Sequence, residues 1–172
     1  YQDALRVDAD YVPARLGLAR ATIEENPPVA KQAIEKALGT NPNYVPAHLL
    51  LAELALDERA RDDARASIKK ALDVNPNSLE AKALEATVAF LEARPADFDR
   101  IVAEVLKISP SYGEVYRVAG DHAARNYRFD EAVDLTRRFG RHLGGYADGA
   151  VDRRRFFPGG AVRSRGARQL LV

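Results

Sequence analysis

The chain has 172 residues, of which 47% are hydrophobic and 30% are charged, a composition that excludes a disordered polar chain. Its 26 Lys and Arg nearly balance its 25 Asp and Glu, so the overall charge indicates no polyanionic partner. No stretch approaches the roughly 18 uncharged apolar residues of a transmembrane helix, and we expect no membrane partner. The absence of cysteine excludes a disulfide scaffold and thiolate metal sites. Because the chain starts at Tyr1 without Met, we expect it to be an excerpt of a longer protein, and we assign no compartment.

Three prolines fall at a fixed spacing. Pro42, Pro76 and Pro110 are equally far apart, and each follows Asn or Ser and, before that, an apolar helix-like ending. Proline disfavours the helical conformation of the residue before it, so each of these points should end a helix. The spacing therefore indicates an internal repeat with a period of about 34 residues.

The predicted elements follow the repeat in chain order. Residues 1–10 fit the end of a preceding repeat, and four copies follow at 11–43, 44–77, 78–111 and 112–138, the last incomplete. Each copy shows two helical patterns. In the second copy, a helix from Val45 is apolar around most of its circumference, a polar break covers 59–63, and an amphipathic stripe begins at Ala64. No segment up to Arg138 is typical of a strand.

Two helices in each period, with these small and large residues, resemble the tetratricopeptide repeat. The copy that shows the pattern most clearly is the second, through His48, Leu51, Ala52, Ala55, Ala64, Ile68, Ala71 and Pro76. The third copy departs from it, with Glu85 in the usual leucine position and Phe98 in a usual alanine position. The resemblance implies an all-α fold, a right-handed solenoid of antiparallel helix pairs.

Small residues recur at equivalent places in the copies. A close crossing of two helices needs short side chains where the axes approach most nearly. We therefore assign a structural role, together with the three repeat prolines, to Ala19, Ala52, Ala86, Gly120, Ala30, Ala64 and Ala132.

The pattern changes at residue 139. Phe139-Gly140 replaces the apolar pair of the other copies, and residues 140–172 carry seven Gly, seven Arg and only two acidic residues. We hypothesise a slip of the reading frame near Arg138; a natural disordered tail is the second alternative, and an arginine-rich contact with nucleic acid the third. Under the first two, residues 139–172 do not form a folded element, and we do not expect a nucleic-acid partner.

No residue pattern indicates catalysis or a cofactor. The three histidines, His48, His122 and His142, lack metal-binding helical spacing, and no phosphate loop, nucleophile elbow or zinc-protease motif is present. Adjacent carboxylates such as Asp62-Asp63 stand at helix starts, where they complement the helix dipole. The sequence therefore predicts a non-enzymatic protein without a bound metal or cofactor.

The resemblance also implies a binding surface, because the first helix of each pair lines the concave side of such a solenoid. Candidates for a groove that holds a peptide or helix are Leu16, Arg20, Ile23, Leu49, Glu53, Leu56, Ala83, Thr87, Phe90, Arg117 and Asp121. The apolar members could equally pack against neighbouring repeats. The expected function is a protein-interaction scaffold whose partner is another protein or a neighbouring domain; the alternative is a helper domain of a larger enzyme.

Overall fold

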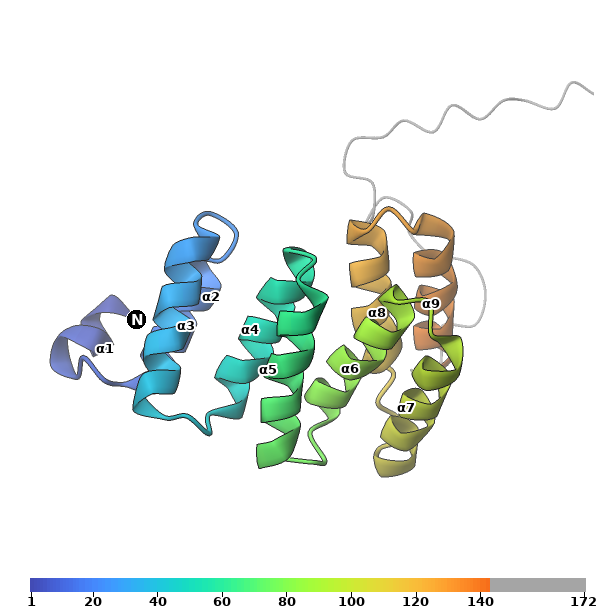
Figure 1. Cartoon of the computed structure of the whole chain (residues 1–172), viewed down its shortest axis with the longest axis horizontal. Coiled ribbons are helices and arrows are strands. Elements are labelled where there is room, and N and C mark those ends of the chain that lie inside the picture. Colours follow the sequence, from blue (N-terminus) through green and yellow to red (C-terminus); the bar gives the residue numbers. More distant parts are fainter. Residues whose placement is uncertain (143–172) are drawn as a thin grey trace, which may run out of the picture.

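The computed structural model describes residues 1–142 and consists there of helices joined by short turns. They are α1 (Gln2–Val7), α2 (Val12–Thr22), α3 (Pro27–Thr40), α4 (Val45–Asp57), α5 (Arg61–Val74), α6 (Leu79–Leu91), α7 (Pro95–Ile108), α8 (Glu114–Arg125) and α9 (Phe129–His142). From α2 onward they form antiparallel pairs that follow one another along the molecule (Figure 1). The predicted all-α fold is confirmed. None of these helices is long and apolar enough to cross a bilayer.

Asparagine and proline together end the second helix of the first two pairs. The backbone N–H of Asn41 donates to the carbonyl of Ala37, and that of Asn75 to the carbonyl of Ala71, both at 2.9 Å. Beyond each proline, the backbone N–H of Asn43 or Asn77 donates to the side-chain oxygen of the asparagine two residues earlier, at 3.1 Å. This side-chain turn replaces the helical hydrogen bonding that proline interrupts, so the chain reverses at the same point in each repeat.

The turns inside the pairs also repeat. Arg59, Ala93 and Tyr127, which stand one period apart, have φ angles of 61°, 55° and 63° and end the first helices of the second, third and fourth pairs in the left-handed conformation. The first pair lacks one residue in this turn, and there the side chain of Asn26 accepts a hydrogen bond from the N–H of Val29. In the first pair, the turn therefore has no left-handed residue, and the second helix, α3, instead begins with a side-chain cap from Asn26.

Short side chains lie where the helices approach each other. Ala19, Ala52 and Ala86 on the first helices and Ala30 and Ala64 on the second helices have no exposed surface, and Ala132 is 2% exposed. A Cβ on Gly120 would lie 3.5 Å from the carbonyl oxygen of Ala132 and from Cβ of Leu135. That distance is ordinary contact, so the backbones of α8 and α9 are already as close as an alanine would permit.

The last helix extends past the predicted end of the repeat at Arg138. α9 continues to His142, where the ring of His142 stacks on Tyr116 with 5.2 Å between centroids. Phe139 also packs close to Gly113, since a Cβ there would meet its ring at 3.1 Å. The Phe139-Gly140 pair therefore continues the helix, because Phe139 supplies an apolar contact with α8. The predictions about residues 143–172 lie outside the described residues.

Candidate functional site

The first helices of the pairs share one face of the molecule. α4 contacts α2 and α6, its neighbours in the row, and it also contacts α8, which belongs to the pair after next. A straight row of helices would keep α4 and α8 apart. Their contact therefore means that the row curves, with α2, α4, α6 and α8 on its concave side.

The residues proposed for the concave groove fall into two groups. Buried residues that pack inside the solenoid are Leu16 (5% exposed), Leu56 (2%), Ala83 (1%) and Thr87 (0%). Residues that reach the surface at least in part are Arg20, Ile23, Leu49, Glu53, Phe90, Arg117 and Asp121. Most of the apolar stripe thus contributes to packing between repeats, and the accessible part of this face is mainly charged.

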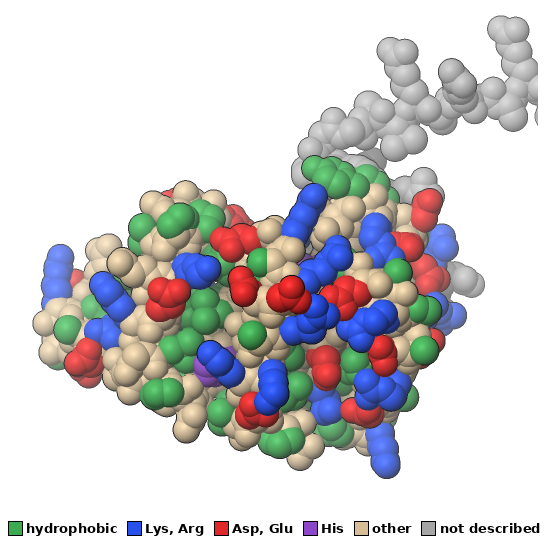
Figure 2. Space-filling model, viewed as in Figure 1, with side chains coloured by type: hydrophobic (Ala, Val, Ile, Leu, Met, Phe, Trp, Pro, Cys, Tyr) green, Lys and Arg blue, Asp and Glu red, His purple; other side chains and the backbone are tan. Residues whose placement is uncertain are grey.

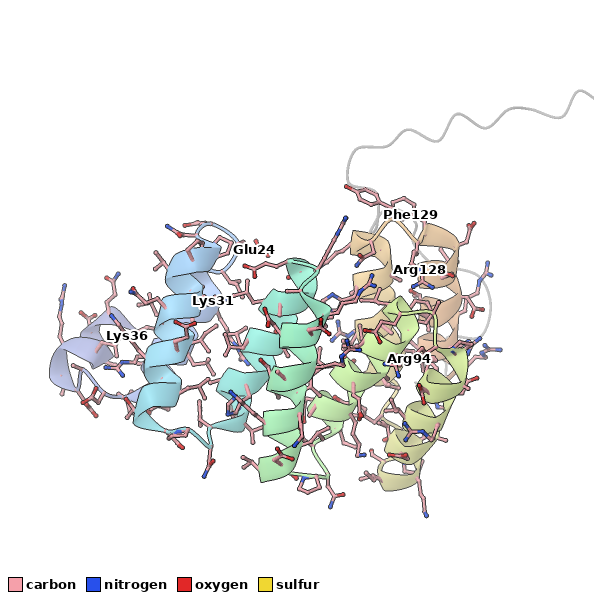
Figure 3. The ribbon with its side chains drawn as sticks, in the orientation of Figure 1. Glu24, Lys31, Lys36, Arg94, Arg128 and Phe129 are labelled. Atoms are coloured by element: carbon pink, nitrogen blue, oxygen red, sulfur yellow. The ribbon has the colours of Figure 1, made fainter. Side chains whose placement is uncertain are left out.

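Phe90 belongs to an aromatic cluster rather than to an open groove. Its ring lies 5.4 Å from the ring of Phe98, which in turn lies 6.4 Å from the ring of Tyr116. The guanidinium of Arg128 lies 4.4 Å from the centre of the Phe90 ring, and its Nη1 donates to the Phe90 carbonyl at 3.0 Å. Arg128, which Figure 3 labels near the α8–α9 turn, thus caps Phe90 through a cation–π contact.

An ion pair crosses the concave face between α4 and α8. Nη1 of Arg125 lies 2.6 Å from Oδ1 of Asp57, and Nδ1 of His122 lies 3.6 Å from the same oxygen. The bridge joins α4 to α8 across α6, whose Ala83 and Thr87 are buried. Sequence reasoning missed Asp57, His122 and Arg125, because no pattern in the chain shows how strongly the row of helices curves.

His122 is 5% exposed, and its Nδ1 has no hydrogen-bond partner within residues 1–142. Burial lowers the pKa of this imidazole, since a charged ring would lose its hydration. The carboxylates of Asp57 and Asp121 act in the opposite direction, and Arg125 adds to the lowering. The ring is therefore neutral at neutral pH and fills space beside the ion pair.

Arg20 on α2 and Glu53 on α4 are exposed charged side chains on the first helices of the first two pairs. Neither makes a hydrogen bond or a close ion pair with the part of the chain that the structure describes, although the charge of Arg20 acts on Glu53. The Glu53 side chain is exposed, yet its carboxyl group lies on the concave face among many protein atoms, and this partial loss of water raises its pKa. A carboxylate in this state is favourable for pairing with a cationic group of a ligand.

The described residues hold no group of three His, Asp or Glu side chains that could bind a metal ion. Nε2 of His48 instead lies 2.7 Å from the carbonyl of Pro42, where it donates a hydrogen bond within the repeat. Two cavities lie away from the concave face: one of about 500 Å³ at the α4–α5 turn, between Arg61 and Glu92, and one of about 380 Å³ over α5, α6 and α7. The concave face thus offers a surface for contact rather than an enclosed reaction site.

The chain resembles solved structures over most of its length. It matches the crystal structure of MamA at 17% identity with a TM-score of 0.59, covering 83% of this chain and 84% of that one. It matches PilF of Pseudomonas aeruginosa at 17% identity with a TM-score of 0.64, covering 85% and 67%. It matches YrrB, described as a TPR protein with an unusual peptide-binding site, at 19% identity with a TM-score of 0.55, covering 85% and 76%. At these identities the matches show a shared fold.

No curated protein matches the sequence significantly. A sequence model described as "Tetratricopeptide repeat" matches residues 21–88, which run from the end of α2 into α6. The same helix-pair pattern continues beyond this segment through α8 and α9. Residues 21–88 therefore match the tetratricopeptide repeat family in sequence, and the helix pairs of the described residues have the fold of helical-repeat scaffolds of this type.

Proposed function

We propose that this chain is a non-enzymatic interaction scaffold that holds a peptide or a helix of a partner against the concave side of α2 and α4. The partner is another protein or a neighbouring domain of the same chain. Two half-buried apolar side chains, Ile23 and Leu49, would supply the affinity, and the charges of Arg20 and Glu53 would supply the selectivity.

The observation that carries the proposal is the state of Glu53. Its pKa is raised by the surrounding protein, yet it has no close ion pair within residues 1–142. An exposed carboxylate on this face without a close ion pair is available to a cationic group of a ligand. Arg20 is unpaired in the same way, so the two charges can receive groups of opposite sign from one bound segment.

The proposed contact surface is smaller than the sequence indicated. Because α4 meets α8 and Ala83 and Thr87 are buried, a ligand would not reach the middle of α6. Arg117 and Asp121 already pair with each other at 2.7 Å and would border the ligand rather than anchor it. The description of YrrB as a peptide-binding TPR protein is consistent with a role in peptide binding, but the place of the site rests on the residues above.

A displayed library of random peptides, selected against the full chain, tests this proposal. Peptides that bind should be lost when Ile23 and Leu49 are both changed to Ser, and they should carry a basic group whose removal mimics the effect of Glu53→Gln. The matched control changes Val29 and Val74 to Ser, since these apolar side chains are 48% and 43% exposed and lie on second helices.

Circular dichroism of each variant establishes that the helices remain. Retained binding by the folded Ile23→Ser, Leu49→Ser double variant would refute the concave site. Equal loss in the Val29→Ser, Val74→Ser control would refute it as well, because that pair lies on the other helices.

A further inference from the structure

A hollow of about 380 Å³ lies over α5, α6 and α7, formed by the second and third pairs. Its floor is apolar, made by Ile68, Leu72, Val88 and Ile101. Glu85 of α6 also lines it, partly buried and without a hydrogen bond or ion pair to residues 1–142. None of these residues belongs to the proposed concave site, so the two surfaces are independent.

Glu85 stands where the preceding pair has an apolar side chain. One period earlier the position is Leu51, which packs against the apolar cluster of α2, α3 and α4. A carboxylate supplies no such apolar contact, and beside an apolar floor it loses part of its water without gaining a donor. The position therefore holds a negative charge that no group of residues 1–142 balances by a close contact.

The basic side chains around the hollow are already paired. Those that line it are Arg65, Lys69, Arg94 and Arg100. Together with Lys82, these five cations pair with five carboxylates, which are Asp62, Asp73, Glu92, Asp97 and Glu104. In Figure 2, basic and acidic side chains lie intermixed over this part of the molecule, where Figure 3 labels Arg94. Glu85 is outside this balanced network, so the charge left over at the hollow is negative.

The apolar floor and the leftover carboxylate together select one kind of side chain. An acidic group would face Glu85 and would find each lining cation already paired. A purely apolar group would cover the Glu85 carboxylate without giving it a hydrogen bond. A long basic side chain meets both requirements, because its methylene groups can cover the floor while its charged end donates to the carboxylate.

We propose that this hollow is a second docking site, which receives one lysine or arginine side chain from a segment of a partner protein. The stem of that side chain lies over Ile68, Leu72, Val88 and Ile101, and its cationic end pairs with Glu85. The residues beside it in the segment are uncharged, since the carboxylates at the rim are already paired and offer no partner to a second cation.

The probe for the test is the capped peptide Ala-Leu-Lys-Leu-Ala, added to the full chain and followed by NMR of side-chain methyl groups. We expect saturable shifts at the four floor residues. Two matched peptides separate the contributions: norleucine in place of lysine keeps the stem without the charge, and diaminobutyrate keeps the charge on a shorter stem. Each should bind at least about tenfold more weakly. The methyl groups of Ile23 and Leu49 report on the concave face separately, so failure of this site and failure of the concave site are distinguishable.

Three variants sharpen the test. Glu85→Gln removes the charge at nearly constant size, and it should weaken the lysine peptide at least about tenfold while leaving the norleucine peptide unchanged. Glu85→Leu covers the floor and should abolish the shifts in a protein that is folded at least as stably as the parent. The matched control, Glu35→Gln, removes an exposed and unpaired carboxylate of α3 and should bind as the parent does.

The proposal is overturned if the lysine peptide gives no saturable shifts at the floor, or if Glu85→Gln binds it as well as the parent. It is also overturned if the norleucine peptide binds equally, because the carboxylate would then contribute nothing. Floor shifts that depend on protein concentration without peptide would overturn it in favour of a second copy of the chain. Floor shifts without peptide, on changing the arginines of residues 143–172 to Gln, would overturn it in favour of that segment as the occupant.

Discussion

The second and third helix pairs have the same dimensions but different interiors. Each consists of a helix of 13 residues and one of 14, joined by a left-handed residue at the turn. In the second pair, Leu51 packs against the preceding repeat and Ala64 lies where the two helices approach. In the third pair, Glu85 and Phe98 take these two places.

The two exchanges act on opposite sides of the third pair. Glu85 lines a hollow over α5, α6 and α7, whereas Phe98, 3% exposed, fills the space toward α8 and joins Phe90 and Tyr116 in one cluster. α6 accordingly packs directly along α8. A repeat of this kind can therefore pack fewer apolar side chains against the preceding pair and more against the following pair, while its two helices keep their lengths.

Removing the large side chain of the third pair should have the largest effect. Phe98→Ala would leave a cavity shared by α6, α7 and α8, and we expect the free energy of unfolding to fall by about 3–5 kcal/mol. Urea denaturation followed by circular dichroism measures it. A loss below about 1 kcal/mol would mean that α8 closes onto α7 when the ring is absent, and that Phe98 does not set the spacing.

Placing the same ring in the second pair tests whether the two interiors are interchangeable. Ala64 has no exposed surface, so Ala64→Phe should overpack the α4–α5 crossing and cost about 1–3 kcal/mol of stability. The same denaturation measurement applies, with Ala66→Phe on the exposed side of α5 as the control. An unchanged stability would contradict the assigned role of Ala64.

Giving the third pair the leucine of the second should have a smaller and opposite effect. Glu85→Leu covers the apolar floor beside Ile68 and Leu72, and we expect a gain of about 1 kcal/mol from the buried apolar surface. A rise of a few degrees in the midpoint of thermal unfolding would show it. A loss of stability would mean that the hydration of the Glu85 carboxylate in its present surroundings outweighs the burial of a leucine at this position.

Because His122 lies beside the Asp57–Arg125 ion pair, the free energy of unfolding should depend modestly on pH. The pKa of His122 is lowered in the fold from its ordinary value of 6.5, so the unfolded chain takes up the proton first, and stability falls as the pH drops through that value. Unfolding curves between about pH 8 and 6 should show this decline. It should be reduced in His122→Gln, and an identical decline in that variant would assign the effect to other groups.

The sequence predicted the helices well because their signals are local. The asparagine–proline turns and the small residues at fixed spacing determine where each helix ends and how closely two helices approach, as at Pro42, Pro76 and Gly120. The expected repeat boundary at Arg138 lies inside α9, which continues to His142, because Phe139 still packs on the apolar cluster that includes α8 even though it departs from the repeat pattern.

The candidate surface was harder to predict, for a physical reason. Leu56 and Thr87 lie on the predicted helix faces, but their exposure depends on the curvature of the whole row, which arises from many small packing choices. The hollow at Glu85 did have a signal in the sequence, a carboxylate in a leucine position. The basic side chains around it come from α5, from the turn before α7 and from α7, and only the folded chain brings them together.

The contact between α4 and α8 has a consequence for how the protein unfolds. In most solenoids each repeat touches only its neighbours, so repeats can open one at a time from the ends. Here the Asp57–Arg125 contact closes a loop of 68 residues around the third pair, so that pair gains less conformational entropy by melting while both of its neighbours hold their relative positions. The half-exposed ion pair contributes at most about 1 kcal/mol, but the helix contact beneath it links the second, third and fourth pairs. Amide protons of α4 to α9 should therefore exchange with solvent as one cooperative unit, while α1 and the first pair open independently.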